Sequence, residues 1–538
     1  MKTKIILLLI ILLGLVLRFY KLSSLPAILN RDEAAIAFNA HLLNQVQKDE
    51  WGKSWPVILE SFGDYKLPGY PYFTAAVFNL APANDLSVRL GSFLAGVILI
   101  LVAFQIAQHS ELLHRQSLHF ALLIAISPVF FFYSRIAFEA NFALMLFVAS
   151  LFFLLFIEAS KTKRLFFDVL AILLLLLAVF TYNSPFLLLP FVILVIPVVR
   201  GMKKWRKWTL PVLGLLVVFV TSLIVFVPLT SQKSGVTIFS DETTWTNLIQ
   251  HRQQYSGIAQ NILGNKYLFY SQIIFKNFIS SFSTEFLVTK GSAHPWHSLN
   301  NFGHMHWGVY LFGLLGIIWS LVETSNWFMH KFIYNKKHKK INKRRSKSIK
   351  QELLLLYLLF ASLFPASVTV DAPHATRSLL FFFIFTLFAV IAIEDLYHLE
   401  FFKKFDKKHL LTWFFVFISI FESSHYFYNY FTNYPNKQPE SLGVTFDKTI
   451  QNLDKKYLNQ KIAIVDPDGY QYILTSWYLK LAPQVYFDTV VRQLPDLIGF
   501  RYGEQVKNYH FIADREDRSE DERILVEWNG NEWLVTEY

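Results

Sequence analysis

The stretch "IILLLIILLGLVLRFY", from Ile5 to Tyr20, decides the fold of this chain. A helix of this composition and about this length can cross the hydrocarbon core of a bilayer, which is roughly 30 Å thick. Similar runs recur along all 538 residues, and the chain is 54% hydrophobic with a mean hydropathy of +0.35. Lipid offers no partners to backbone polar groups, so the spanning helices must pack on one another. The predicted fold class is an all-α polytopic membrane protein.

The apolar runs predict about eleven transmembrane helices. The segment 68–82 is too short to cross comfortably, and we expect it to lie at the interface before the second span. The predicted spans lie near 5–20, 88–108, 118–134, 142–159, 165–182, 185–199, 209–229, 307–322, 352–368, 378–394 and 410–426.

The net charge of +12 is concentrated in short loops at 200–208, 331–350 and 401–409. All three loops fall on the same side of the predicted membrane, which indicates that this side is cytoplasmic. Basic loops here are a topology signal with attraction to anionic lipid, rather than a nucleic-acid surface. The predicted localisation is therefore a multi-pass cell-membrane protein with a cytoplasmic N-terminus.

An odd number of spans places the C-terminus outside. We predict a transmembrane domain over 1–426, with outer loops at 21–87 and 230–306. A small extracytoplasmic α/β domain should follow over 427–538, because the stretch 461–487 alternates strand-like and helix-like patterns. The chain has no cysteine, so no disulfide supports these outer parts.

Ionisable residues are nearly absent from the middles of the spans and gather at their outer ends. A transporter needs such groups near the bilayer midplane, along a pathway. Carboxylates and cations at one depth favour a reaction site at the outer face instead. These residues are Asp32, Glu33, Asp64, Lys66, Arg135, Glu139, Asp371, His374 and Arg377.

This mixture suits the transfer of a sugar from a lipid phosphate. A carboxylate can take the proton of an attacking hydroxyl as general base. A Lys or Arg can stabilise the departing phosphate. Because the lipid tail lies in the bilayer, its phosphate would emerge at the depth of these outer cations.

At these residues the sequence resembles the membrane-embedded GT-C glycosyltransferases, specifically the group of protein O-mannosyltransferases and lipid A aminoarabinose transferases (glycosyltransferase family 39-like). The resemblance covers roughly residues 1–400. It implies a polyprenyl-phosphate sugar donor, inverting transfer at the outer face, and a protein, lipid or glycan acceptor. Its motifs are "RDEAAIAFNAHLL" (31–43), "GDYKLPGYPYF" (63–73), "PVFFFYSRIAFEANFALML" (128–146) and "HATRSLLFFF" (374–383).

The resemblance also implies roles for single residues. The acidic residue of the first outer loop is Asp32, the candidate base or acceptor contact, with Glu33 beside it as a second catalytic candidate. The acidic residue of the second outer loop is Glu139. Because the donor arrives activated on its lipid, no nucleotide cofactor is needed, and a divalent metal is compatible but not predicted. The donor-phosphate candidates are Lys66, Arg377 and His374.

The sequence departs from both parts of the group. The aminoarabinose transferases carry an arginine shortly after the acidic pair, where this chain has Ala34 and Ala35, with Arg31 just before the pair. The eukaryotic mannosyltransferases carry a His-Pro-Pro stretch where this chain has "YKLPGY". The resemblance therefore carries over neither the sugar nor the acceptor.

Each candidate has an alternative structural role. Asp32 could be the N-cap of a helix beginning near it, and Glu139 could be only the helical salt-bridge partner of Arg135. Lys66 could extend along the interface, and Arg377 could anchor a helix end. The alternative functions are a lipid-linked-sugar flippase or transporter, and a non-catalytic membrane scaffold.

The stretch "HPWHSLNNFGHMHWG" (294–308) is rich in histidine. Its spacing permits a metal site, although no carboxylate lies inside it. Trp296 and Trp307 instead favour contact with an acceptor or a sugar.

Overall fold

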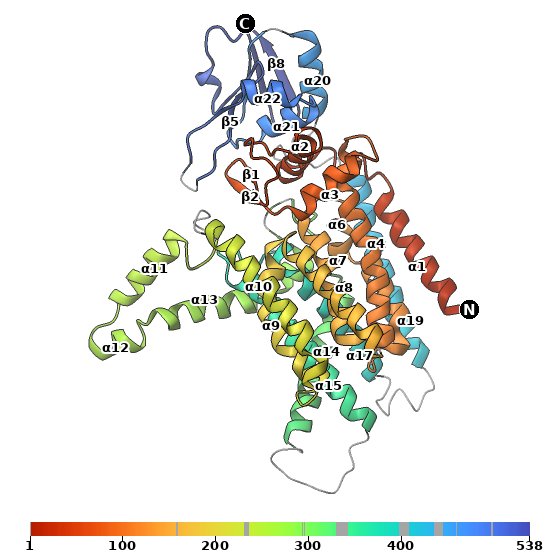
Figure 1. Ribbon diagram of the computed structural model, residues 1–538. Coiled ribbons are helices and arrows are strands. Elements are labelled where there is room, and N and C mark those ends of the chain that lie inside the picture. Colours follow the sequence, from red (N-terminus) through yellow and green to blue (C-terminus); the bar gives the residue numbers. More distant parts are fainter. Residues whose placement is uncertain are drawn as a thin grey trace.

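A computed structural model gives the fold of the chain (Figure 1). A bundle of long helices forms its lower part, and a sheet with short helices, which holds the C-terminus, stands above one end of the bundle. The predicted basic loops at 331–350 and 401–409 lie largely outside the described residues. The structure describes residues 2–157, 160–230, 236–292, 294, 296–329, 343–396, 408–434, 445–458, 460–496 and 499–538.

Every predicted span lies in a helical segment, although the span 118–134 divides into two short helices, and seven described helices are long and apolar enough to cross a membrane. These seven are Asp85–His109 (α4), Glu139–Phe156 (α7, Glu139–Leu151, and its continuation), Asn183–Arg200 (α9), Thr209–Phe226 (within α10, Thr209–Thr230), Trp307–Phe328 (α14), Ser348–Ser367 (α15, Lys343–Ser362, and α16, Phe364–Ser367) and Thr376–Leu396 (containing α17, Leu379–Leu396). The other predicted spans correspond to α1 (Lys2–Phe19), α5 (Ser117–Ile126) with α6 (Pro128–Phe132), α8 (Lys161–Val179) and α19 (Lys408–Tyr428).

Helix α17 lies at the centre of the bundle. It is apolar on all sides, and 83% of its span is buried against other helices, including α14, α15, α5 and α7. A helix that is hydrophobic all round belongs inside a bundle. In α10, by contrast, only 28% of the span is buried, as expected of a helix that faces lipid.

Buried arginines fix the segment that leads from α1 to α2 (Arg31–Val46). The guanidinium of Arg135 donates to the carbonyl oxygens of Arg18 (2.7 Å) and Leu25 (3.0 Å). That of Arg89 donates to the carbonyl oxygen of Pro26 (3.0 Å). Buried carbonyls outside regular structure need such partners. The arginines therefore hold this segment against the bundle and set where α2 begins.

Helix α2 begins with a reciprocal cap joined to a buried ion pair. Asn30 Oδ1 accepts a hydrogen bond from the Glu33 N–H (3.0 Å), and Glu33 Oε2 accepts one from the Asn30 N–H (3.1 Å). Glu33 Oε1 accepts from Arg89 Nε (3.1 Å) and from the Ala137 N–H (2.7 Å). The capping box satisfies two backbone donors, and the ion pair ties the start of α2 to α4.

A short hairpin and a short helix follow α2 at the end of the bundle that carries the sheet part (Figure 1). Strand β1 (Leu59–Ser61) pairs antiparallel with β2 (Asp64–Lys66). Helix α3 (Gly69–Phe78) occupies the segment predicted to lie at the interface, and it packs against α2 and α4.

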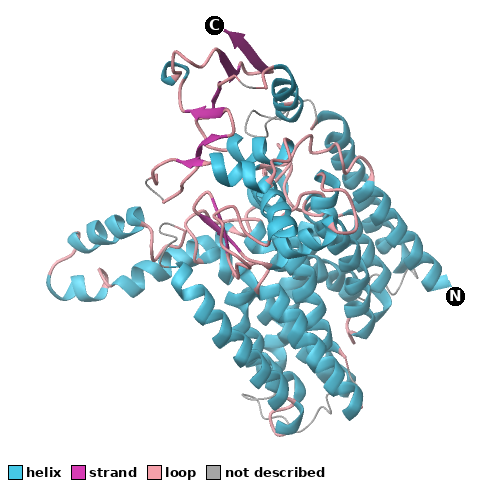
Figure 2. Cartoon of the chain, turned by 45° about the horizontal axis from the view of Figure 1, so that its top comes forward, coloured by secondary structure: helices cyan, strands magenta, loops and turns pink. Residues whose placement is uncertain are grey.

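The C-terminal part is a six-stranded mixed sheet in the order β4-β5-β6-β3-β7-β8, which confirms the predicted mixture of strands and helices. The central strand β3 runs parallel to β6 and β7, and the other neighbours are antiparallel. Figure 2 shows these strands grouped apart from the helical bundle. The elements are α20 (Phe446–Lys456), β3 (Ile462–Val465), α21 (Gln471–Tyr478), α22 (Pro483–Thr489), β4 (Val491–Arg492), β5 (Gly503–Val506), β6 (Tyr509–Ile512), β7 (Ile524–Trp528) and β8 (Trp533–Glu537).

Buried polar bonds connect the sheet part to the first outer segment. Glu50 accepts hydrogen bonds from the Tyr472 hydroxyl (3.1 Å) and from Arg492 Nη2 (3.3 Å). Asp85, at the start of α4, accepts one from Trp477 Nε1 (2.9 Å). Helix α21 therefore packs on α2, and the turn before α21 lies near the start of α2.

The predicted outer loop 230–306 divides into two parts. Helices α11 (Glu242–Gln253), α12 (Gly257–Ile262) and α13 (Lys266–Ser280) form an arm that projects sideways from the bundle (Figure 1). The stretch from 285 to 306 returns to the outer ends of the helices, where Gly303 and Met305 bond to the backbone of Val288 and Leu287.

We expect Arg89→Met to destabilise the protein by about 3–5 kcal/mol, because the variant leaves the Glu33 carboxylate buried without its cation. Thermal unfolding in detergent measures the effect. Arg515→Met is the control, since Arg515 and Glu527 form an exposed pair at 3.3 Å whose loss should cost at most about 1 kcal/mol. Equal unfolding temperatures for the two variants would contradict a dependence of α2 on this ion pair.

Candidate active site

The outer segments that carry the predicted site residues meet between the bundle and the sheet part. Asp32 lies in the first turn of α2, Lys66 ends β2, and Glu139 begins α7. Arg377 lies in a turn directly before α17. Lys66 is within electrostatic range of both Asp32 and Glu139, and Tyr182 is within range of both Glu139 and Arg377. Residues from distant parts of the sequence thus share one site.

Asp32 is bonded directly to a cation. Lys66 Nζ lies 3.0 Å from Asp32 Oδ1 and 3.2 Å from Asp64 Oδ2. Arg31 Nε lies 4.0 Å from Asp32 Oδ1. The side chains of Asp32 and Lys66 are 19% and 11% exposed, so the pair is largely enclosed but still reachable.

The neighbouring charges set the protonation states of this pair. Burial alone would raise the pKa of Asp32, but Lys66 and then Arg31 bring that pKa below its ordinary value. Burial would lower the pKa of Lys66, but Asp32, Asp64 and Glu139 raise it above its ordinary value. Near neutral pH the Asp32 carboxylate is therefore ionised and can accept a proton.

The N-cap of α2 is Asn30, so the alternative that made Asp32 the cap is wrong. The side chain of Asn30 already accepts the hydrogen bond that a cap receives, from the Glu33 N–H. Asp32 lies inside the first turn and its side chain bonds Lys66 instead.

Glu33, predicted as a second catalytic carboxylate, has a structural position. Both of its oxygens are occupied by the bonds to Asn30, Arg89 and Ala137, and the side chain is 1% exposed. We therefore correct its assignment from catalysis to holding α2. The spacing Asn30-x-x-Glu33 is a capping box, and this pattern in the sequence could have separated Glu33 from Asp32.

Glu139 is buried on the same side of the site as Lys66. The alternative in which it serves only as the partner of Arg135 is wrong. The Arg135 guanidinium bonds carbonyl oxygens in the last turn of α1 and after it, and also the Tyr430 hydroxyl (3.1 Å). Among the described residues, no ion pair joins it to Glu139.

Arg377 and His374 form the other half of the site. Arg377 Nη1 donates to Thr369 Oγ1 (3.1 Å) and to Asp371 Oδ1. His374 Nε2 lies 3.5 Å from Asp371 Oδ2. Burial, and then the charge of Arg377, hold the pKa of His374 well below its ordinary value. This half therefore offers one permanent cation and a neutral imidazole.

Sequence reasoning missed Tyr182, which follows α8. Its hydroxyl bonds Thr376 Oγ1 (2.8 Å), and the same oxygen bonds His374 Nδ1 (3.0 Å). Tyr182 thus connects the start of α9 to the turn that holds Arg377. A tyrosine between two apolar runs carries no signal in the sequence that distinguishes it from an interfacial anchor.

His297 also belongs to this site, although the sequence suggested it only as a metal ligand. Its Nδ1 bonds the Tyr133 hydroxyl (3.1 Å), and its ring lies 4.8 Å from that of His374. Burial lowers the pKa of His297 to about 4. Since His297 is within electrostatic range of Asp32 and Arg377, it lies between the two halves of the site.

Two other histidines of that stretch, His304 and His306, bond serines outside this set of residues. His304 Nε2 bonds Ser292 Oγ (3.2 Å), and His306 Nε2 bonds Ser423 Oγ (2.8 Å). Within the described part of the chain, no group of three or more His, Asp or Glu side chains could hold a metal ion.

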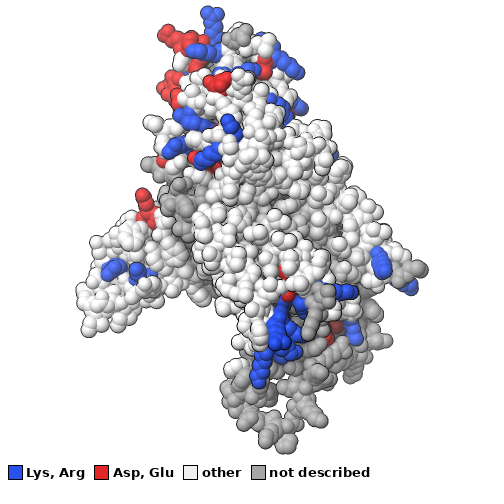
Figure 3. Space-filling model, viewed as in Figure 1, with Lys and Arg blue, Asp and Glu red and all other residues white. Residues whose placement is uncertain are grey.

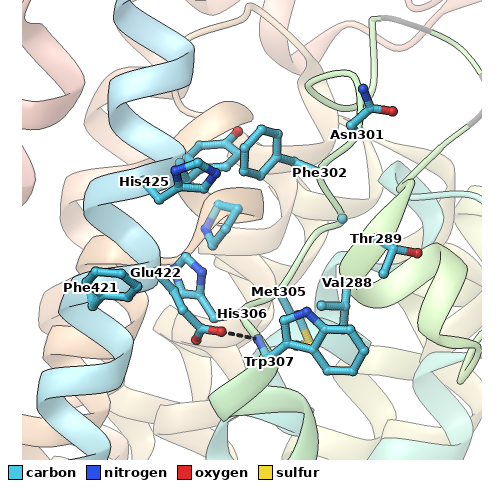
Figure 4. A pocket seen from close by; sticks show the side chains of 13 residues that line it. Val288, Thr289, Asn301, Phe302, Met305, His306, Trp307, Phe421, Glu422 and His425 are labelled. Atoms are coloured by element: carbon cyan, nitrogen blue, oxygen red, sulfur yellow. Dashed lines mark hydrogen bonds between the residues drawn. The ribbon is translucent and has the colours of Figure 1, made fainter.

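A separate cavity of about 270 Å³ lies between α19 and the start of α14 (Figure 4). Glu422 Oε1 accepts a hydrogen bond from the Trp307 N–H (3.1 Å), so this carboxylate caps α14. Trp307 lines this cavity with Phe421 and Met305. None of Asp32, Lys66 and Arg377 is among the lining residues, so Trp307 does not belong to the candidate active site.

Residues 66–231 match the family model described as dolichyl-phosphate-mannose-protein mannosyltransferase. The matched segment begins at Lys66 and contains Glu139 and Tyr182. By its description this family takes its sugar from a lipid phosphate. No curated protein matches the chain significantly.

Solved structures resemble the chain in fold. The oligosaccharyltransferase of Archaeoglobus fulgidus, tethered to an acceptor peptide with the NVT sequon, shares 13% identity and a TM-score of 0.50. The match covers 88% of this chain and 63% of that one, so the chain spans less than two thirds of the archaeal enzyme. ArnT from Cupriavidus metallidurans, bound to undecaprenyl phosphate, shares 13% identity and a TM-score of 0.40, over 88% of this chain and 84% of that one.

The chain is thus a multi-pass membrane protein that matches the dolichyl-phosphate-mannose-protein mannosyltransferase model over residues 66–231, which confirms the predicted resemblance there, and its fold resembles that of the archaeal oligosaccharyltransferase.

Proposed function

We propose that this protein moves a sugar from a polyprenyl-phosphate donor to an acceptor hydroxyl at the outer face of the membrane. The observation that carries the proposal is the ionised Asp32, bonded to Lys66 where the outer segments meet. A carboxylate base facing a guanidinium such as Arg377 is what this transfer requires. The family match over residues 66–231 supports the same class of reaction.

Asp32 acts as the general base. The acceptor oxygen attacks the anomeric carbon of the donor sugar while its proton passes to Asp32. The bond from that carbon to the phosphate oxygen breaks, and its electron pair leaves with the phosphate. Attack from the face opposite the phosphate inverts the anomeric centre in one displacement, without a sugar–enzyme bond.

Arg377 binds the departing phosphate, and the neutral His374 adds an N–H donor. Lys66, the third phosphate candidate, bonds Asp32 and Asp64 in this state. A phosphate near Lys66 would draw its ammonium away from Asp32. Because Lys66 lowers the pKa of Asp32, this loosening would make the carboxylate a stronger base when the donor is bound. Glu139, on the same side, positions the acceptor or assists Asp32.

We further propose the topology and the domain division. Eleven spans over 1–426 place the N-terminus in the cytoplasm, and 427–538 form an extracytoplasmic domain. Figure 3 supports this orientation, because the end of the bundle opposite the sheet part shows mainly Lys and Arg, whereas the sheet part shows Lys and Arg mixed with Asp and Glu. The described basic residues there include Arg200, Lys203 and Arg206, between α9 and α10.

The transporter alternative finds no specific support in the described helices. Of the buried arginines in and beside these helices, Arg18 and Arg135 bond backbone carbonyls, and Arg89 bonds carbonyls and Glu33. Arg200, at the end of α9, pairs with Asp168 of α8 (2.6 Å), so each of these cations already has a partner within the fold. A scaffold, in turn, would not need Asp32 to be ionised and reachable.

We expect Asp32→Asn to lower sugar transfer by at least about a hundredfold, because the amide keeps the shape but cannot take a proton. Transfer from polyprenyl-phosphate sugars is measured in isolated membranes, with donor binding measured separately and expected to persist. Asp241→Asn is the matched control, since Asp241 caps α11 in the arm (2.6 Å to the Thr244 N–H) and Asn caps equally well. Full activity of Asp32→Asn would show that Asp32 is not the general base.

The pH profile should reveal the influence of Lys66. The pKa of Asp32 is depressed, so the base stays ionised until the pH falls below its ordinary pKa. Lys66→Met removes the main cation, so the acid limb of kcat/KM should move to higher pH by about 1–3 units. Lys53→Met, which breaks the outer pair with Glu60 (2.9 Å), should leave the limb unmoved. If the acid limb of kcat/KM does not move in Lys66→Met, Lys66 does not set the pKa of the catalytic base.

Arg377→Gln should lower kcat/KM for the donor by about 10- to 150-fold, the effect of losing a hydrogen bond to a charged group. Saturation with the donor at fixed acceptor measures this change. Arg252→Gln, on the arm helix α11, should behave like the wild type. If both variants saturate with donor equally, the phosphate is bound elsewhere.

A further inference from the structure

The guanidinium of Arg31 lies among aromatic rings from separate parts of the chain. Its central carbon is 4.6 Å from the ring centroid of Tyr470 and 5.5 Å from that of Trp296. Its Nη1 lies 3.4 Å from the Tyr502 hydroxyl. Because Arg31 Nε is 4.0 Å from Asp32, this aromatic group begins directly beside the proposed base.

The turn between β3 and α21 holds Tyr470 rigidly. Asp466 accepts hydrogen bonds from the N–H groups of Tyr470 (2.9 Å) and Gln471 (2.8 Å). Gly469 has a φ of +72°, and a Cβ there would lie 2.3 Å from the Tyr502 ring, so only glycine fits. The turn follows the carboxyl end of a central parallel strand, the edge at which α/β sheets bind ligands.

Two buried donors in this group have no hydrogen-bond partner among the described residues. They are Nε1 of Trp296, a residue that is 4% exposed, and Nε of Arg31. A buried donor left unpaired is costly, which marks a place where an oxygen of a ligand fits. The exposed His294, whose ring lies 4.5 Å from that of Trp296, and the exposed Asp468 add polar atoms at the rim. Asp468 is within electrostatic range of His294.

We propose that Arg31, Trp296, Asp468, Tyr470 and Tyr502 form the acceptor subsite, and that the acceptor is a sugar ring, either of a glycan or of a glycolipid headgroup. Aromatic faces pack against the C–H groups of a sugar, while the polar atoms around them bind its hydroxyls. The proposal rests on the proposed transferase function. The acceptor hydroxyl gives its proton to Asp32, its oxygen bonds the anomeric carbon, and the phosphate leaves with the electron pair of the broken bond.

The position of this group favours the acceptor over the donor. Arg377, the proposed phosphate contact, lies at the start of α17 in the bundle, where the donor lipid would lie. Tyr470 and Tyr502 belong to the sheet part, which stands above the bundle (Figure 1). A peptide acceptor would call for an extended groove or a free strand edge to bind its backbone. Aromatic rings and polar groups gathered around the Arg31 guanidinium suit a sugar better than an extended peptide.

The test uses the full chain in membranes of its own host, which contain the natural acceptor, supplied with polyprenyl-phosphate donors labelled in the sugar. The labelled product is then classified. Protease digestion identifies labelled protein, solvent extraction identifies labelled lipid, and separation by size identifies labelled glycan. We expect label that resists protease, extracted with lipid if the source is a glycolipid and retained in the aqueous phase if it is a glycan.

Acceptor and donor KM are then compared for Trp296→Phe, which keeps a ring and removes only the N–H. We expect the acceptor KM to rise about three- to tenfold with the donor KM unchanged. Trp307→Phe, which alters the separate cavity, should change neither. Asp468→Asn, at an exposed position that does not endanger folding, should also raise the acceptor KM.

Label released as glycopeptide would overturn this subsite while leaving the transferase intact. Unchanged acceptor KM in both Trp296→Phe and Asp468→Asn, or a rise confined to the donor KM, would overturn it as well. Absence of labelled product with every donor would instead remove the proposed function, and this subsite with it.

Discussion

The buried ion pair between Glu33 and Arg89 is the constraint on which the outer part of the structure depends. Successive residues on a helix point about 100° apart, so an adjacent acidic pair cannot face the same way. Glu33 points inward and is enclosed by Arg89 and two backbone N–H groups. That fixes the rotation of α2 and directs Asp32 toward Lys66 and the outer surface. One carboxylate of the pair positions the other.

The site then depends on how its charges balance. Asp32, Asp64 and Glu139 surround Lys66, so the ammonium is stabilised in an enclosed place where burial alone would disfavour it. In return Lys66 keeps Asp32 ionised. Arg31 is a second cation beside Asp32, and the guanidinium of Arg377 has Asp371 as its own partner. In the proposed reaction, a phosphate entering on the Arg377 side would share that guanidinium with Asp371, while an acceptor hydroxyl would enter beside Asp32.

Much of the fold was accessible from the sequence because membranes impose simple rules on length and polarity. Every predicted span lies in a helical segment, and the strand-like pattern around 461–487 lies in the C-terminal sheet. The gathering of charge at outer ends also led to Asp32, Lys66, Glu139 and Arg377, which the structure brings together. The choice between Asp32 and Glu33 was harder, because it depends on the Asn30 cap of α2 and on Arg89, a cation in the later helix α4.

Other members of the site could not be predicted, because they depend on contacts between segments far apart in the chain. Tyr182 is defined by its bond to Thr376, and His297 by its contacts with Tyr133 and His374. The same holds for Arg31, which gains its aromatic neighbours only because the sheet part packs over the start of α2.

Under the proposed function, this packing explains why a membrane transferase would carry the sheet part. Helices can hold a lipid phosphate at the bilayer boundary, but a polar acceptor arrives from water and needs a surface outside the bilayer. Bonds from Tyr472 to Glu50 and from Trp477 to Asp85 fix α21 above the bundle. The turn before α21 is therefore held beside Asp32 in advance. If the acceptor binds there as proposed, a rigid turn would align it with Asp32 and so favour transfer over reaction with water, because part of the entropy is already lost on binding.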